Sequence, residues 1–113
     1  MDQNILEDTP LISVVMCSYN GMPYIKEAVT SILEQTYTNW ELIISDDVST
    51  DGTREWLIEN FKTHPKIRLF LQEKNLGYVA NKNFAHRQDQ GTYITQLDND
   101  DLSTRDRLEK QLN

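Results

Sequence analysis

Apolar residues along the chain fall into short runs that follow two different periods. Four runs rich in aliphatic, β-branched and aromatic residues are typical of buried strands; they span residues 11–17, 40–44, 67–71 and 92–97. Each run is followed by a segment whose apolar residues recur every three or four positions, as on one side of a helix. These segments begin near Pro23, cover 53–61 and 78–87, and resume at Ser103. The pattern therefore predicts the order β-α-β-α-β-α-β-α.

The spacing of apolar residues also predicts which side of each helix is buried. The expected inward-facing positions are, in chain order, Ile25, Ala28, Val29, Ile32, Leu33, Trp56, Leu57, Phe61, Val79, Ala80, Phe84, Ala85, Leu108 and Leu112. The third helix is the most weakly patterned of the four. Ser103, with Asp106 three residues later, is expected to cap the last helix.

Alternation of strands and helices at this spacing predicts the fold class. It indicates right-handed crossovers, and therefore an α/β fold with a mainly parallel sheet of about four strands and helices on both faces. In such sheets, ligands bind outside the carboxyl ends of the strands, where the strand order changes direction. Tyr19, Asp47 and Asp100 follow the first, second and fourth strands. We therefore expect their side chains to line the same edge of the sheet.

Composition narrows the class of protein. The 113 residues suit one domain, and a formal charge of −7 argues against binding to a nucleic-acid backbone. The single cysteine, Cys17, excludes an internal disulfide, and with two separated histidines it offers no thiolate or imidazole metal site. No apolar run reaches membrane-spanning length, and residues 1–10 are polar and acidic, unlike a secretory signal. We expect a cytoplasmic protein. Peripheral association of the full-length protein with a membrane is a further alternative.

Carboxylates crowd the end of the last predicted strand, in the segment Asp98-Asn99-Asp100-Asp101. Carboxylates this close repel one another, so a divalent cation bound by their oxygens would stabilise them and could hold a phosphate-bearing ligand. A plainer interpretation is a solvated acidic turn that caps the next helix. The position after a buried strand, together with a second acidic pair at Asp46-Asp47, favours the cation site.

Other phosphate and calcium motifs are absent or incomplete. No glycine loop of the dinucleotide-binding or P-loop type occurs. An EF-hand loop counted from Asp47 places Ile58 where a bidentate Glu is required, and one counted from Asp98 has Ser103 in place of the obligatory glycine. A calcium-binding or acidic interaction module therefore remains only as an alternative.

Four motifs, in order along the chain, resemble those of the family 2 glycosyltransferases of the GT-A fold. They lie at residues 12–20, 41–53, 75–77 with Asn83, and 91–101. The likeness runs from Leu11 to the end of the chain. It implies a Rossmann-like GT-A half-domain over residues 11–113 that binds a nucleotide-diphospho-sugar, preceded by a polar extension at 1–10.

The same resemblance implies a nucleotide-sugar donor, usually a UDP-sugar, a Mn²⁺ or Mg²⁺ ion, and transfer with inversion at the anomeric carbon. The positions that match the family's donor contacts are Cys17, Tyr19, Asn20, Asp47 and Asp98, with Asp100 as the metal ligand. The first three would cradle the nucleotide. Asp47 would hydrogen-bond the base, and Asp98 would reach the ribose or the sugar.

The chain departs from the family pattern at Met16-Cys17, Val48 and Lys82, and in its length. The family's catalytic domain is about twice this size, and its general base follows the acidic motif. We therefore expect no catalytic residue here, a domain truncated at the C-terminus, and a fragment that is inactive alone. The acceptor stays open between a saccharide, a lipid-linked and a protein substrate. An uncovered sheet edge would favour self-association, and a non-catalytic nucleotide-binding module is the main alternative function.

Overall fold

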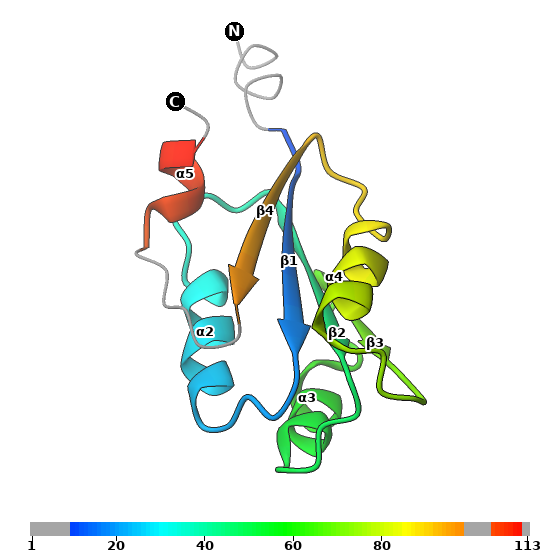
Figure 1. Cartoon of the computed structure of the whole chain (residues 1–113). Helices are drawn as coiled ribbons and strands as arrows, with labels where there is room; N and C mark the ends of the chain where they lie inside the picture. Colours follow the sequence, from blue (N-terminus) through cyan, green and yellow to red (C-terminus); the bar gives the residue numbers. More distant parts are fainter. Residues whose placement is uncertain (1–9, 99–104, 112–113) are drawn as a thin grey trace, which may run out of the picture.

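The computed structural model describes residues 10–98 and 105–111, which form one sheet flanked by helices (Figure 1). The elements, in chain order, are β1 (Ile12–Ser18), α2 (Tyr24–Leu33), β2 (Trp40–Asp46), α3 (Thr53–Phe61), β3 (Ile67–Leu71), α4 (Tyr78–His86), β4 (Tyr93–Asp98) and α5 (Arg107–Gln111). The predicted alternation and the α/β fold class are confirmed. Most of the extension expected at 1–10, the cap expected at Ser103, and Leu112 lie outside the described residues.

All strand pairs are parallel, and the strand order is β3-β2-β1-β4. The chain runs outward from β1 through β2 to β3, then crosses back to place β4 on the other side of β1. The order therefore changes direction between β1 and β4. Near the carboxyl end of these strands, Cys17 pairs with Ser45 of β2 and with Asp98 of β4. This end of the sheet is where a ligand is expected.

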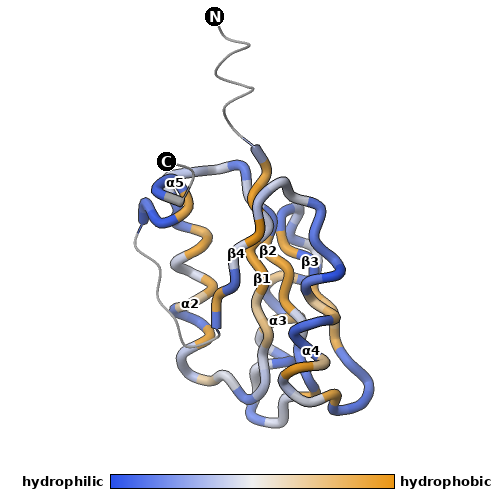
Figure 2. Tube along the Cα trace, turned by 45° about the horizontal axis from the view of Figure 1, so that its top comes forward, coloured by the Kyte–Doolittle hydropathy of each residue, from blue (hydrophilic) through white to orange (hydrophobic). Residues whose placement is uncertain are grey.

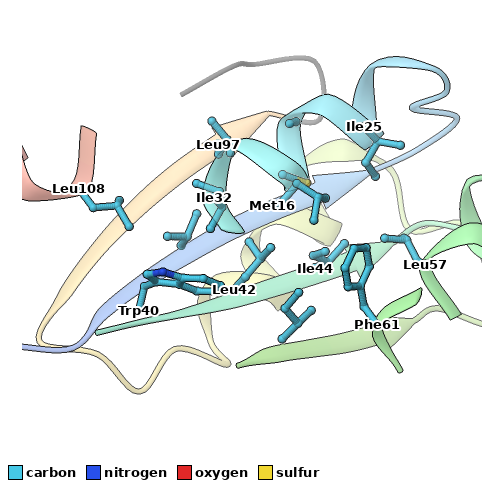
Figure 3. Close-up of a cluster of buried hydrophobic side chains, with 14 of the residues drawn as sticks. Met16, Ile25, Ile32, Trp40, Leu42, Ile44, Leu57, Phe61, Leu97 and Leu108 are labelled. Atoms are coloured by element: carbon cyan, nitrogen blue, oxygen red, sulfur yellow. The ribbon is translucent and has the colours of Figure 1, made fainter. Parts of the chain in front are cut away.

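One face of the sheet carries the main hydrophobic core, beneath α2, α3 and α5. Side chains from these helices meet those of the strands there, among them Met16, Ile25, Leu42, Leu57 and Leu108 (Figure 3). Both central strands, β1 and β2, are buried along their whole length. Figure 2 shows the hydrophobic colour concentrated in these two strands. Continuous apolar runs of this kind are expected where helices cover a parallel sheet on both sides.

The other face is covered by α4 and has a smaller core, formed by buried Val15, Cys17, Ile43 and Ala85. Phe70 of β3 packs beside it and makes an edge-on contact with Phe84, with ring centroids 5.4 Å apart. This face also holds buried polar side chains, namely Ser13, Glu41, Ser45 and Asn81. The two faces therefore differ in chemistry although the same strands supply both.

Three of the positions expected to face the core are exposed. Leu33 is 37% exposed at the end of α2, Val79 is 68% exposed, and Ala80 is exposed beside it. On α4, Ala85 is buried as expected, and so is Asn81. Its side chain makes two hydrogen bonds to Ser45 of β2. A polar anchor at Asn81 therefore joins the apolar contact of Ala85 on the side of this helix that faces the sheet.

Within the described residues, β3 and β4 are the outer strands of the sheet, so each has an open edge. Tyr93 and Ile94 at the start of β4 are about half exposed. Open edges of this kind are what the expected self-association requires. None of the helices in this part of the chain is long and apolar enough to cross a membrane.

Candidate functional site

A pocket of about 560 Å³ opens at the carboxyl end of the sheet, where the strand order changes direction. Its walls come from the ends of β1, β2 and β4 and from the segment that leads into α4. Four of the residues singled out in the sequence line it, namely Cys17, Tyr19, Asp47 and Asp98. The parallel topology thus brings together side chains that lie far apart along the chain.

The two other candidate residues are Asn20 and Asp100. Asn20 follows Tyr19 directly but is not part of the pocket lining. Asp100 lies outside the described residues, so the acidic motif is described only at Asp98, an exposed residue at the end of β4.

The Asp47 carboxylate is held by the backbone of the loop that precedes α4. The Leu76 N–H donates to Oδ1 at 2.6 Å, and the Gly77 N–H donates to Oδ2 at 2.9 Å. Asp47 is 3% exposed, yet it lines the pocket. A carboxylate has about four acceptor positions, so these two bonds fix its direction and leave capacity for an N–H of a ligand.

Val48, directly after Asp47, has a left-handed backbone with φ of 60°. A β-branched side chain is strained in this region, at a cost of about 1–3 kcal/mol. The departure from the family pattern at Val48 therefore coincides with a strained turn at the pocket.

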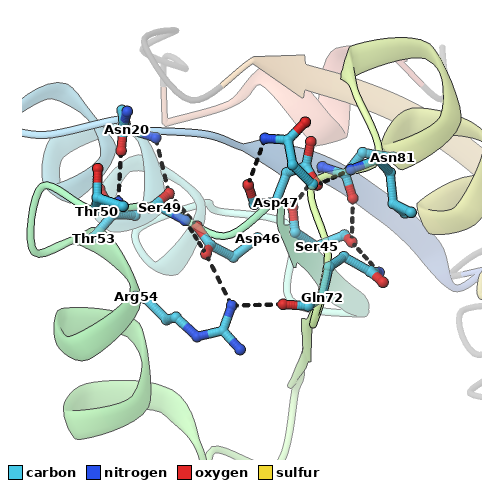
Figure 4. A network of polar contacts seen from close by, with 12 residues as sticks. Asn20, Ser45, Asp46, Asp47, Ser49, Thr50, Thr53, Arg54, Gln72 and Asn81 are labelled. Atoms are coloured by element: carbon cyan, nitrogen blue, oxygen red, sulfur yellow. Dashed lines mark hydrogen bonds and ion pairs between the residues drawn. The ribbon is translucent and has the colours of Figure 1, made fainter.

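The neighbouring acid, Asp46, makes different contacts. It is fully buried, and its carboxylate accepts the Ser49 N–H at 3.0 Å and the Ser49 hydroxyl at 2.6 Å. The Arg54 guanidinium lies 3.6 Å from the same carboxylate and donates to the Gln72 carbonyl at 3.0 Å (Figure 4). Asp46 therefore closes the turn after β2 and ties it to α3, outside the pocket lining.

Asn20 joins the loop after β1 to the loop after β2. Its N–H donates to Ser49 Oγ, and its Oδ1 accepts the Thr50 N–H, both at 2.8 Å (Figure 4). Its φ of 51° is left-handed, a conformation that Asn tolerates better than most residues. Through these bonds Asn20 fixes the backbone next to Tyr19 at the rim of the pocket.

Burial raises the pKa of the Cys17 thiol to about 11. The nearby carboxylates of Asp98 and Asp47 also raise this pKa, whereas a hydrogen bond with Gln96 and the charge of Lys82 lower it. Cys17 is therefore a neutral thiol at physiological pH. Since the thiolate is the reactive form, it serves the pocket as a small wall residue and not as a nucleophile.

The pocket offers oxygen ligands of the kind that hard divalent cations prefer, because Asp47 and Asp98 both line it. Over residues 10–98 and 105–111, no group of three His, Cys, Asp or Glu side chains is close enough to hold a metal.

The EF-hand alternative loses support here. Asp47 and Asp51 both direct their carboxylates at N–H groups of the chain itself, those of Leu76 and Thr53 among them.

Five further residues line the pocket without having been given a ligand contact from the sequence, namely Ser18, Asn75, Gly77, Tyr78 and Asn81. The turn at 75–77 was predicted, and its place between a strand and a helix was the available signal. Tyr78 is 58% exposed at the first turn of α4. Asn81 lies in the helix predicted over 78–87 but is not one of its predicted apolar positions, so its burial is visible only in the structure.

Three known proteins show what this chain is similar to. A Bacillus subtilis glycosyltransferase named for teichuronic acid biosynthesis, TuaG, is 45% identical over 103 residues, covering 91% of this chain and 41% of TuaG. S. aureus TarS in complex with UDP-GlcNAc is 28% identical with a TM-score of 0.79, over 88% of this chain and 29% of that one. The mannosyltransferase PcManGT from Pyrobaculum calidifontis, in complex with GDP-Man and Mn²⁺, is 31% identical with a TM-score of 0.76, over 85% and 29%.

The chain spans less than half the length of each of these proteins. A family model described as glycosyl transferase family 2 matches residues 13–113. This range contains the whole pocket and all of the sheet except the first residue of β1. The chain therefore belongs to glycosyl transferase family 2.

Proposed function

We propose that this chain binds the nucleotide-diphosphate part of a UDP-sugar and forms the donor-binding half of a metal-dependent, inverting glycosyltransferase. The observation that carries the proposal is the pocket at the change of strand order, where Tyr19, Asp47 and Asp98 come from three separate strand ends. Membership of the family supports it, and so does the UDP-GlcNAc bound by the similar structure of TarS.

In this proposal the base lies against Asp47. The carboxylate is aimed by two backbone N–H groups and can accept the ring N–H of uracil in a charge-assisted hydrogen bond. Tyr19 is 54% exposed and offers a ring face for stacking, while Cys17 supplies a neutral wall. Asn20 contributes to the nucleotide cradle by fixing the loop that carries Tyr19.

The acidic motif is proposed to hold the diphosphate side of the donor. Asp98 lines the pocket and would reach the ribose or the sugar, and Asp100 would be the metal ligand. Carboxylate oxygens suit Mn²⁺ or Mg²⁺. Such a cation would neutralise the charge that the diphosphate gains as the glycosidic bond breaks. The Mn²⁺ in the PcManGT complex supports this part of the proposal.

We place the transfer step itself outside these 113 residues. Inversion in one displacement needs a base that deprotonates the acceptor hydroxyl. The chain covers 41% of TuaG, which leaves room for that base and for the acceptor site in a further segment. The acceptor can be a saccharide, a lipid-linked or a protein substrate. We expect the chain alone to bind the donor without transferring sugar.

Titration calorimetry of UDP with the 113-residue chain tests the proposal. We expect binding that strengthens with Mn²⁺ or Mg²⁺. It should weaken about tenfold or more in Asp47→Ala, because a hydrogen bond to a charged group contributes about 1.5–3 kcal/mol. Asp100→Ala should abolish the gain from the ion and leave metal-free binding unchanged. Glu59→Ala, an exposed acid on α3, is the control. UDP affinity that is the same in Asp47→Ala as in the unmodified chain would contradict the proposal.

A further inference from the structure

A buried amide forms part of the pocket wall on α4. Asn81 is 2% exposed and lines the pocket. Its backbone N–H donates to the Gly77 carbonyl at 2.9 Å, and the N–H of Gly77 is one of the two that hold the Asp47 carboxylate. The first turn of α4 therefore holds Asn81 and Asp47 in one wall. A polar side chain buried this deeply is costly unless its hydrogen bonds are made.

The hydrogen bonds of Asn81 fix which way its amide points. Nδ2 donates to the Ser45 carbonyl at 3.0 Å, and Oδ1 accepts the Ser45 hydroxyl at 2.6 Å. Gln72 Nε2 donates to the oxygen of that same hydroxyl at 3.1 Å (Figure 4). The proton of the Ser45 hydroxyl is therefore directed at Asn81 Oδ1. Because the Ser45 carbonyl can only accept, flipping the amide would lose the bond to that carbonyl.

One donor of this amide is left over. An Asn side chain carries two N–H groups, and one of them is bonded to protein within the described residues. The direction of the second is set by the first, since the amide is planar. The pocket wall therefore contains an oriented acceptor at Asp47 and, at Asn81, an oriented amide whose second N–H has no protein partner within the described residues.

We propose that Asn81 is a specificity-determining residue that donates to a carbonyl oxygen of the nucleobase while Asp47 accepts the adjacent ring N–H. The inference rests on the proposed function, because it assumes that a base lies against Asp47. An acceptor beside a donor matches an edge in which a ring N–H adjoins a C=O, as in uracil and guanine. Cytosine and adenine present an unprotonated ring nitrogen and an amino group there, which a carboxylate and an N–H would disfavour.

Asn75, the other amide in the pocket wall, is less suited to this role. It is exposed, and its side-chain N–H donates to the main-chain carbonyl of Asp47 at 3.3 Å. Asn81 is buried and held at both ends of its amide. A donor that is already ordered loses less entropy on binding and therefore discriminates better between bases.

The test compares UDP with CDP, which differ only in this edge of the base. For the unmodified chain we expect UDP to bind at least about tenfold more tightly than CDP, because CDP leaves buried polar groups unpaired. In Asn81→Ala, UDP affinity should fall about three- to tenfold with little change for CDP, so that the ratio shrinks. An equal loss for both nucleotides would show that Asn81 acts on folding alone and would overturn the inference.

Three further measurements keep the result unambiguous. Asn60→Ala is the matched control. Asn60 is exposed on α3, and its side chain also donates to a backbone carbonyl, that of Trp56 at 2.9 Å. The ratio of UDP to CDP affinity should not change in this variant. If Asn81→Ala fails to fold, Asn81→Ser takes its place, because serine keeps a hydroxyl that can donate to Ser45. This variant should show the same reduced ratio of UDP to CDP affinity. The unmodified chain should bind 4-thio-UDP less tightly than UDP, because sulfur accepts more weakly and the C4 oxygen is the carbonyl that cytosine lacks.

The outcomes separate this inference from the proposed function. UDP binding with a UDP-to-CDP ratio that no Asn81 variant changes, and with 4-thio-UDP bound as tightly as UDP, would overturn the role of Asn81 and leave donor binding in place. A chain that does not bind UDP at all would reject the proposed function, and the role of Asn81 with it.

Discussion

The two faces of the sheet are built from the same strands but from different chemistry. The face under α2, α3 and α5 is an apolar core in which residues such as Val14, Leu42 and Ile44 are completely buried. The face under α4 buries polar side chains next to a small apolar cluster. Apolar packing tolerates many similar arrangements, whereas a buried polar group must find its partner. The polar face is therefore the one that can hold a pocket wall in a defined geometry.

The polar face contains two separate networks. At the carboxyl end, Ser45 and Asn81 lie at the pocket. At the amino end, the Glu41 carboxylate accepts the Ser13 hydroxyl at 2.5 Å, the Gln90 N–H at 2.8 Å and the Arg68 Nε–H at 3.3 Å. The second network attaches the segment before β4 to β1 and β2. It supports the site from a distance by holding the strand that carries Asp98.

The largest expected effect is on the free energy of unfolding. It should distinguish residues of the apolar face from the exposed positions that were predicted to be buried. Leu42→Ala removes a fully buried side chain and should lower the free energy of unfolding by about 2–5 kcal/mol. Val79→Ala, at a position that is 68% exposed, should change it by no more than about 0.5 kcal/mol. Urea denaturation followed by circular dichroism measures both values. Similar losses in the two variants would contradict the assignment of Val79 to the surface.

A second prediction concerns the amino-end network. A Cβ at Gly91 would lie 2.6 Å from Ser13 Oγ and 2.7 Å from the Leu11 carbonyl oxygen. Gly91→Ala should therefore destabilise the chain by about 1–3 kcal/mol through overpacking. Removing the hydroxyl as well, in Ser13→Ala with Gly91→Ala, should relieve only part of this, because the Leu11 carbonyl remains. Thermal unfolding tests it, and an unchanged melting temperature in Gly91→Ala would show that β4 is not packed this closely.

The adjacent acids allow a direct test of site against scaffold. Asp46→Asn should reduce the free energy of unfolding by about 1–3 kcal/mol, since the Arg54 and Ser49 contacts lose their charge. Asp47→Asn should instead lower UDP affinity about tenfold, which is about 1.4 kcal/mol. Denaturation and calorimetry on both variants give the two numbers. If Asp46→Asn weakened UDP binding more than Asp47→Asn does, the division of roles between them would be wrong.

The smallest expected effect is on the pH dependence of stability. The pKa of Cys17 is raised from 9.0 to about 11 in the folded chain, so the unfolded chain loses this proton first as the pH rises. The contribution is fully present below pH 9.0 and is lost as the pH rises towards about 11. Cys17→Ala should remove about 1–2 kcal/mol of the decline over this interval. The same slope of unfolding free energy against pH in both proteins would argue against a buried neutral thiol.

Much of the fold was predictable, because strand and helix periods are local properties. The bounds of α3 and β3 match the predicted ranges, and the right-handed crossover rule was enough to predict that Tyr19 and Asp47 lie at one edge, where Asp98 also lies. The acidic motif was also recognisable from its position after a strand, although Asp100 lies outside the described residues.

The remaining features depend on contacts between distant residues, which no local pattern encodes. The acidic pattern alone gave Asp46 and Asp47 as a pair, and only the family resemblance singled out Asp47. The structure turns Asp46 inward to Ser49 and Arg54, whereas Asp47 lines the pocket. The rotation of α4 was predicted only in part for a similar reason: Ala85 faces the sheet as expected, but Asn81 does so in place of Val79. The hydrogen bonds of Asn81 to Ser45 outweigh the burial of Val79 in setting which side of the helix faces the sheet.

The central claim is that one ligand binds where the strand order changes direction. Backbone and side-chain amide chemical shifts, followed during a UDP titration, test this claim most directly. We expect the largest changes at the N–H groups of Tyr19, Leu76 and Gly77 and at the side-chain amide of Asn81. The Gln90 and Gly91 signals, from the opposite end of the sheet, should stay in place. Shifts concentrated at Gln90 and Gly91, or a spectrum that UDP leaves unchanged, would contradict the account.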